Sequence, residues 1–174
     1  MKKINYRTLA KRYLTIVKKQ TFIKGAFIDG NYAYVMDGCS YMRYPADVYE
    51  EIFAPFELST PDILKKLVRD SASVNAKPFY HVVGNIDKDK FLLQDGANFK
   101  IIAAKYLKPF LAYDEIKYVE VSLPYGTGKQ DTTRTPLIVM DSESNIIGYI
   151  LPISAGRYDT LENLTKQVKE YEEG

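Results

Sequence analysis

Positively charged residues at helical spacing are the side chains of this 174-residue sequence whose chemistry is best defined. Between Asn5 and about Gln20, apolar residues fall on one side of a predicted amphipathic helix, and the other side carries lysine and arginine without any acid. Salt bridges between successive helical turns therefore do not explain the charge. Such a face is either solvated or in contact with the phosphate groups of a polyanion. The candidate phosphate-contacting residues are Lys3, Arg7, Lys11, Lys18 and Lys19.

A second set of candidate cations lies on two further predicted helices. Ser59-Thr60-Pro61-Asp62 combines a hydroxyl cap, a proline at the first helical position and an acid in the first turn, which predicts a helix running to about Asp70. Another helix begins near Ala104, and Pro109 predicts its kink or early end because proline has no amide hydrogen to donate. The outward cations of these two helices are Lys65, Lys66, Arg69, Lys105 and Lys108.

Residue types used in catalysis occur, but not in a catalytic pattern. Gly126-Thr-Gly-Lys129 resembles the end of a phosphate-binding loop, yet the full motif needs glycine in place of Leu123 and a hydroxyl residue in place of Gln130. We expect a hairpin loop there instead. His81, the only histidine, lies in an apolar run and is expected in the core or on a sheet face, and Asp37 is expected in a turn. These patterns favour a protein that is not an enzyme and has no metal and no cofactor.

Composition sets the broad class. With 46% apolar residues, the chain can bury a full core as one domain or one domain with an extension. Cys39 is the only cysteine, which excludes an intrachain disulfide. No apolar run approaches the length of a membrane span, so we expect a cytoplasmic protein without a membrane partner. The first 24 residues are basic and contain no acid, whereas the chain from Asp159 onward is net acidic.

The alternation of helices and strands predicts an α+β fold with antiparallel sheet. Residues 22–28 and 32–36 flank a turn signal, as do residues 137–141 and 146–153, so each pair is expected to form a hairpin. A helix followed by strands begins three times, near Asn5, Pro61 and Ala104. Residues 1–153 are the expected domain, in which residues 45–98 are either an insertion or an additional half-unit.

Residues 157–174 predict a C-terminal helical extension. Leu161, Leu164, Val168 and Tyr171 recur at spacings of three and four, with Asp159 or Thr160 as the cap. This apolar stripe favours a helix packed on its own sheet. A short dimer seam is the alternative.

Four motifs follow one another in the second half of the chain. They are Ala104-Lys105-Tyr106-Leu107 in a helix, an acid-flanked strand over residues 115–123, Thr135-Pro136-Leu137, and Tyr149-Ile-Leu-Pro-Ile153. In this order they resemble the last half of the C-terminal domain of the bacterial sliding clamp, the processivity subunit of the replicative DNA polymerase. The resemblance implies a DNA-clamp-like fold, with helices packed on one face of antiparallel sheet.

The same resemblance implies a function. The inner wall of a clamp ring consists of helices that bear cations, so we expect a DNA-binding or replication-accessory protein whose basic helices contact duplex phosphates. One domain cannot encircle a duplex, and a ring would therefore require a homo-oligomer. The closing strand of clamps lines a pocket for short peptides of replication proteins. The matching residues here are Leu137, Tyr149, Leu151, Pro152 and Ile153, although Ser154 stands where the family usually has arginine.

One alternative comes from a different functional class. The chain could be a protein–protein interaction or inhibitory module from a mobile element, with no nucleic-acid role. Its basic helix would then contact an acidic protein.

Overall fold

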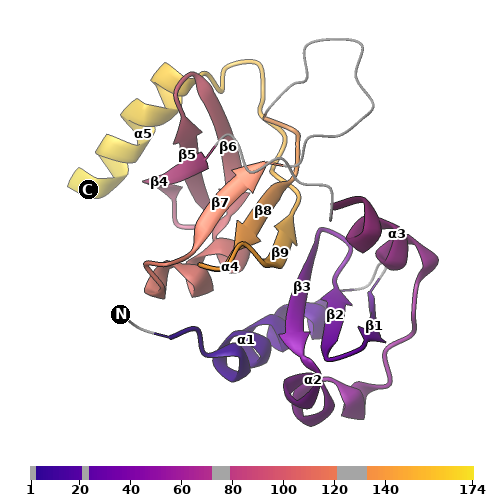
Figure 1. Ribbon diagram of the computed structural model, residues 1–174. Coiled ribbons are helices and arrows are strands. Elements are labelled where there is room, and N and C mark those ends of the chain that lie inside the picture. Colours follow the sequence, from indigo (N-terminus) through magenta and orange to yellow (C-terminus); the bar gives the residue numbers. More distant parts are fainter. Residues whose placement is uncertain (1–2, 21–23, 72–78, 121–132) are drawn as a thin grey trace.

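The computed structural model describes residues 3–20, 24–71, 79–120 and 133–174. Within them the strands form one antiparallel sheet in the order β1-β2-β3-β9-β8-β7-β4-β5-β6 (Figure 1). The predicted α+β fold with antiparallel sheet is confirmed. The strands are β1 Gly25–Asp29, β2 Tyr32–Met36, β3 Ser40–Pro45, β4 Phe79–Asp87, β5 Lys90–Asp95, β6 Asn98–Ala103, β7 Lys117–Glu120, β8 Leu137–Met140 and β9 Ile146–Ile150. The helices are α1 Tyr6–Lys19, α2 Ala46–Ile52, α3 Asp62–Ser71, α4 Ala104–Leu107 and α5 Leu161–Glu173, with short 3₁₀ turns η1 Ala54–Phe56 and η2 Lys108–Ala112.

Helix α1 forms where its amphipathic pattern predicts it. The Asn5 side chain caps it by accepting a hydrogen bond from the Thr8 amide at 3.0 Å. The apolar stripe, which includes Tyr13 and Val17, is buried against the sheet. Helix α4 has only one turn and passes directly into η2 at Lys108, which confirms the early end expected from Pro109.

The chain contains two similar units whose last strands meet. One unit is α1-β1-β2-β3 and the other is α4-β7-β8-β9, and β3 pairs with β9 in antiparallel fashion over Ser40–Met42. Val35 and Met36 end β2 and are followed by Asp37, just as Val139 and Met140 end β8 and are followed by Asp141. In each unit the aspartate accepts backbone amide hydrogens of the following turn. The two units therefore share sequence and turn chemistry as well as element order.

Residues 45–98 add to this same sheet. They contain α2, α3, β4 and β5, and β4 continues the sheet by pairing with β7 at Phe79 and Tyr80. The sheet then curls, because Ile153 beyond β9 forms a bridge with Ile101 in β6. At the other edge, the Ala26 amide of β1 donates to the Ser59 carbonyl. Both outer strands are therefore partly covered by other segments of the chain.

Helices cover both faces of the sheet. In β2, Ala33 and Val35 face the cluster formed with α1, α2 and α4, whereas Tyr34 and Met36 face the cluster formed with α3. The expected packing on one face holds for α1, α2 and α4. Helix α3 lies on the opposite face, where Leu64 is fully buried.

Helix α5 is the predicted C-terminal extension, and it packs along β4 and β5, with Ile101 of β6 in the same apolar cluster (Figure 1). Thr160 caps it by accepting from the Asn163 amide, and Leu164 and Val168 are buried on the sheet. A Cβ atom added at Gly84 of β4 would lie 2.8 Å from Val168 Cγ1. Glycine at this position therefore allows the close approach of α5.

We predict that Gly84→Ala destabilises the protein by about 1–3 kcal/mol, because the new methyl group overpacks the contact with α5 and alanine rarely adopts the φ of +155° found here. The free energy of unfolding from urea denaturation measures this effect. In a Val168→Ala background the same substitution should cost less, since the contact with Val168 is relieved while the strain at the φ of +155° stays. An equal cost in both backgrounds would show that α5 does not set the requirement for glycine.

Candidate nucleic-acid interface

The cations on one side of α1 have neighbours in α2 and η1. Arg7, Lys11 and Lys18 recur at spacings of four and seven, which aligns them along the helix. Arg7 Nη2 lies 2.6 Å from Glu51 Oε2, and Lys18 Nζ lies 4.8 Å from the centroid of the Phe56 ring. The Arg7 and Glu51 side chains are 59% and 48% exposed, so this ion pair contributes little and can exchange for another partner. Within the described residues, Lys11 has no ion pair.

On its other side, α1 borders a cleft that we name the basic cleft. It has a volume of about 300 Å³ and lies between α1, the turn joining β4 to β5, and α4 with η2. Its four cations come from all three walls, and Asp89 is its only acid, so its formal charge is +3. None of the four has an ion pair among the described residues. The residues lining it are Arg12, Thr15, Ile16, Lys88, Asp89, Ala104, Lys105, Lys108 and Pro109.

Backbone hydrogen bonds hold two walls of the basic cleft together. The Ala104 amide at the start of α4 donates to the Asp89 carbonyl at 2.8 Å. The Asp89 amide donates to Asp87 Oδ1 at 2.8 Å, which fixes the turn that carries Lys88. The relative position of Lys88 and Lys105 is therefore set by the fold, although both side chains are exposed.

A buried polar network ties α1 and α4 to a single turn. The Asp37 carboxylate is fully buried and accepts hydrogen bonds from the Ser40 amide and hydroxyl, each at 2.9 Å, and from the Tyr106 hydroxyl of α4. The Tyr13 hydroxyl of α1 donates to the Ser40 carbonyl at 3.2 Å. Asp37 is a turn residue, as predicted, and it also positions both helices.

Burial raises the pKa of both Tyr13 and Tyr106. Desolvation raises the pKa of Tyr13 well above its ordinary value, and the charge of Asp37 raises it further. The pKa of Tyr106 is also raised, first by desolvation and then by its hydrogen bond to Asp37. Both hydroxyls thus stay protonated in the folded protein under conditions in which a free tyrosine ionises.

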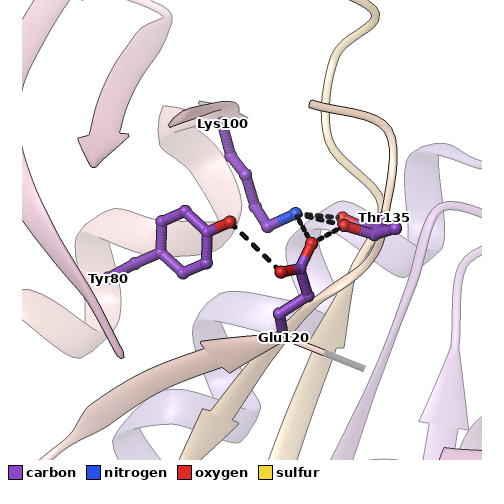
Figure 2. A network of polar contacts seen from close by, with 4 residues as sticks. All are labelled: Tyr80, Lys100, Glu120 and Thr135. Carbon is purple, nitrogen blue, oxygen red and sulfur yellow. Dashed lines mark hydrogen bonds and ion pairs between the residues drawn. The ribbon is translucent and has the colours of Figure 1, made fainter. Parts of the chain in front are cut away.

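A second buried network joins β6 to β7 and to the start of β8. Figure 2 shows Lys100, which is fully buried, with its ammonium 3.0 Å from Glu120 Oε1 and 2.7 Å from the Thr135 carbonyl. Lys100 Nζ also donates to Thr135 Oγ1, and the Tyr80 hydroxyl donates to the other oxygen of Glu120. With three acceptors around its ammonium and no exposed surface, Lys100 is a structural cation that solvent and nucleic acid do not reach.

The structure separates the cations predicted on α3 from those on α1 and α4. Lys65, Lys66 and Arg69 are exposed, but α3 covers the opposite face of the sheet. They cannot contact a straight duplex together with α1. Lys3, Lys19, Lys105 and Lys108 are exposed on the α1 and α4 side.

The residues predicted to bind peptides are dispersed. Leu137 is fully buried in the cluster beneath α1, and Ile153 packs in the cluster beneath α5. Tyr149 and Leu151 do come together, in a pocket of about 160 Å³ that also includes Ile63 and Leu67 of α3. The other predicted residue, Pro152, is half-buried and is not in this pocket.

Several further expectations concern other residue types. His81 is exposed on β4, in agreement with a sheet-face position, and Gly126-Thr-Gly-Lys129 lies outside the described residues. Among the described residues, no group of three or more His, Cys, Asp or Glu side chains is arranged to hold a metal ion. Every helix in that part of the chain is too short or too polar to cross a membrane.

Comparison of the chain with known protein families, with curated proteins and with solved structures gives no match. The resemblance to sliding clamps therefore stays a prediction from the sequence motifs.

Two members of the basic cleft were not among the candidate residues from the sequence. Arg12 lies on the polar side of α1, but helical spacing does not reveal which neighbour that side faces. Lys88 lies in the turn Asp87-Lys-Asp-Lys90, where alternating charge suggests solvation. Only the tertiary structure brings them beside Lys105.

We predict that Lys100→Met lowers the free energy of unfolding by about 3–5 kcal/mol, because Glu120 is left buried without its cation. Lys100→Met combined with Glu120→Leu should lose less, since it removes both charges. Chemical denaturation of the two variants measures the difference. A double variant less stable than the single one would contradict this account of the network.

We also predict that stability falls as the pH rises above about 10, where the tyrosines of the unfolded chain ionise. The folded protein keeps its protons on Tyr13 and Tyr106, so the unfolded state is favoured by about 1.4 kcal/mol per pH unit for each buried group. Urea denaturation between neutral and alkaline pH should therefore give a shallower decline for Tyr106→Phe than for the native protein. Tyr158→Phe is the control, since that side chain is 76% exposed, and it should leave the slope unchanged. Equal slopes for Tyr106→Phe and the native chain would refute the linkage.

Proposed function

We propose that this protein is a non-catalytic DNA-binding protein that contacts the phosphates of a duplex through α1 and α4. The observation that carries the proposal is that α1 bears exposed cations and no acid, and lies on the same sheet face as α4, with cations of both helices converging at one cleft. Exposed cations on helices gain free energy from counterion release when they meet DNA. Arg7 would first exchange Glu51 for a phosphate group.

This surface suits binding that does not depend on sequence. The 14 residues of α1 span about 21 Å, which is long enough to follow several phosphates along one strand. Lysine and arginine at its surface position a protein on the duplex without reading base edges. The resemblance to sliding clamps supports the same role, because clamp rings face DNA with basic helices. A role as a replication accessory follows from that resemblance.

The covered sheet edges favour an open binding module over a ring. Clamp-type rings join sheet edges across subunits, but here Ser59 bonds to β1 and Ile153 bonds to β6. A homo-oligomeric ring would have to displace these contacts or use another surface. Light scattering of the purified protein, with and without duplex, distinguishes a monomer from a ring.

The pocket at Tyr149 and Leu151 supports a second candidate role in binding a partner peptide. It is lined mostly by apolar side chains, and Ile63 and Leu151 at its rim are 48% and 42% exposed. Titration of a clamp-binding peptide should perturb the NMR signals of Tyr149 and Leu151. Unchanged signals would remove this role without affecting the DNA proposal.

A competition experiment distinguishes DNA binding from the alternative in which α1 contacts an acidic protein. In that case, as for an inhibitory module of a mobile element, the same cations would be needed but duplex DNA would compete poorly. Displacement of the acidic partner by mixed-sequence DNA at low concentration would favour nucleic acid.

We predict that Arg7→Ala/Lys11→Ala/Lys18→Ala weakens duplex binding and lowers the slope of log K against log salt by about 2–3. Lys65→Ala/Lys66→Ala/Arg69→Ala removes the same charge from the opposite face and should change both quantities much less. Fluorescence anisotropy with a labelled mixed-sequence duplex, from low to physiological salt, measures both. The proposal fails if the native protein does not bind duplex at low salt, or if the two triple variants lose affinity equally.

A further inference from the structure

The basic cleft differs from the rest of the cationic surface in being recessed. Exposed residues such as Lys11 and Lys19 extend from a convex helix, and each can meet one phosphate at most. In the cleft, cations from α1, the β4–β5 turn and α4 with η2 line a volume of about 300 Å³. That volume is at the small end of the range for ligand sites, which is roughly 300–1,000 Å³.

The chemistry of the lining selects an anion rich in oxygen. Arg12 offers a planar set of donors that suits phosphate oxygens, and Lys88, Lys105 and Lys108 add three point charges. Thr15 is also in the lining, but its hydroxyl already donates to the Lys11 carbonyl. The apolar side chains of Ile16, Ala104 and Pro109 offer nothing to a polar uncharged ligand. A formal charge of +3 matches phosphate groups better than a single carboxylate.

The cleft is also preorganised. The Ala104–Asp89 hydrogen bond joins two of its walls, and the Asp37 network holds α1 and α4 to one turn. Cations positioned before binding lose less conformational entropy when the ligand arrives. The fold therefore sets where each cation enters the cleft, while the cationic side chains themselves are exposed.

We infer that the basic cleft is the anchoring site of the DNA-binding surface, where Arg12, Lys88, Lys105 and Lys108 together bind adjacent phosphate groups of a polyanion. This inference rests on the proposed function for its source of phosphate, the backbone of a nucleic acid. Free inorganic polyphosphate also presents adjacent phosphate groups, and the experiment below separates these two sources. Asp89 is the one group in the cleft that opposes the ligand, and its charge weakens binding.

The test compares three variants with the native chain in binding labelled duplex and in binding tripolyphosphate. Arg12→Ala/Lys88→Ala should weaken binding of each about tenfold. The matched double variant Lys65→Ala/Lys66→Ala, on the opposite face, should change neither more than about twofold. Asp89→Asn keeps the shape of the side chain and removes its charge, so it should tighten binding by about threefold. Thermal denaturation verifies that each variant is folded.

The outcomes separate the cleft from the proposed function. Suppose that the native protein binds duplex but Arg12→Ala/Lys88→Ala has the same duplex affinity as the opposite-face variant. The assignment of the cleft as the anchoring site is then overturned, and the proposal of DNA binding stands. If tripolyphosphate binds with the expected variant pattern and duplex does not, the cleft is supported with free polyphosphate as its ligand, and the DNA proposal falls. Asp89→Asn weakening the binding would overturn the assigned electrostatics. Binding of neither ligand would overturn both proposals.

Discussion

The antiparallel pairing of β3 with β9 is the junction on which this structure depends. It involves three residue pairs, from Ser40 opposite Ile150 to Met42 opposite Gly148, and it joins the two similar units into one sheet. The Asp37 turn lies immediately before it. Because Ser40 binds Tyr13 of α1 and Asp37 binds Tyr106 of α4, the two helices meet the sheet at the same point. A buried carboxylate with several donors favours one arrangement strongly, since a lost partner leaves it unsatisfied in an apolar environment.

The local periodicity of the sequence was sufficient for most of the elements. A turn signal predicted the hairpin that contains Tyr32, alternating apolar residues predicted the strand that begins at Lys117, and the apolar spacing of Leu9, Tyr13 and Val17 predicted α1. The C-terminal helix followed from its cap and stripe. The apolar periodicity of a helix does not reveal on which face of the sheet the helix packs. Helix α3 is amphipathic in the same way as α1, and only the path of the chain after Phe56 takes it to the other face.

The same limit explains why the sequence predicted only part of the candidate site. A helical period identifies the polar side of α1, but that side is wide enough to contain both Arg7 and Arg12. The first contacts Glu51, and the second borders α4, and sequence spacing gives no basis for this difference. Lys88 and Lys105 are brought together by a backbone hydrogen bond between segments that contain no shared motif. Sequence spacing does not predict the burial of Lys100 either. An isolated lysine in an apolar strand is expected to be exposed at an edge rather than buried beside Glu120 and Thr135.

Burial of Lys100 also has a consequence for how the sheet reaches its alignment. Along β6, Lys100 and Ile102 face inward, while Ile101 faces α5. A shift of β6 by one residue would exchange these faces and bring the ammonium under Leu164 and Val168, which offer it no acceptor. Desolvating an unpaired ammonium costs several kcal/mol, so misaligned forms of this strand are unstable relative to the native one. A single charged side chain in the interior therefore stabilises the native alignment of β6 relative to alignments shifted by one residue.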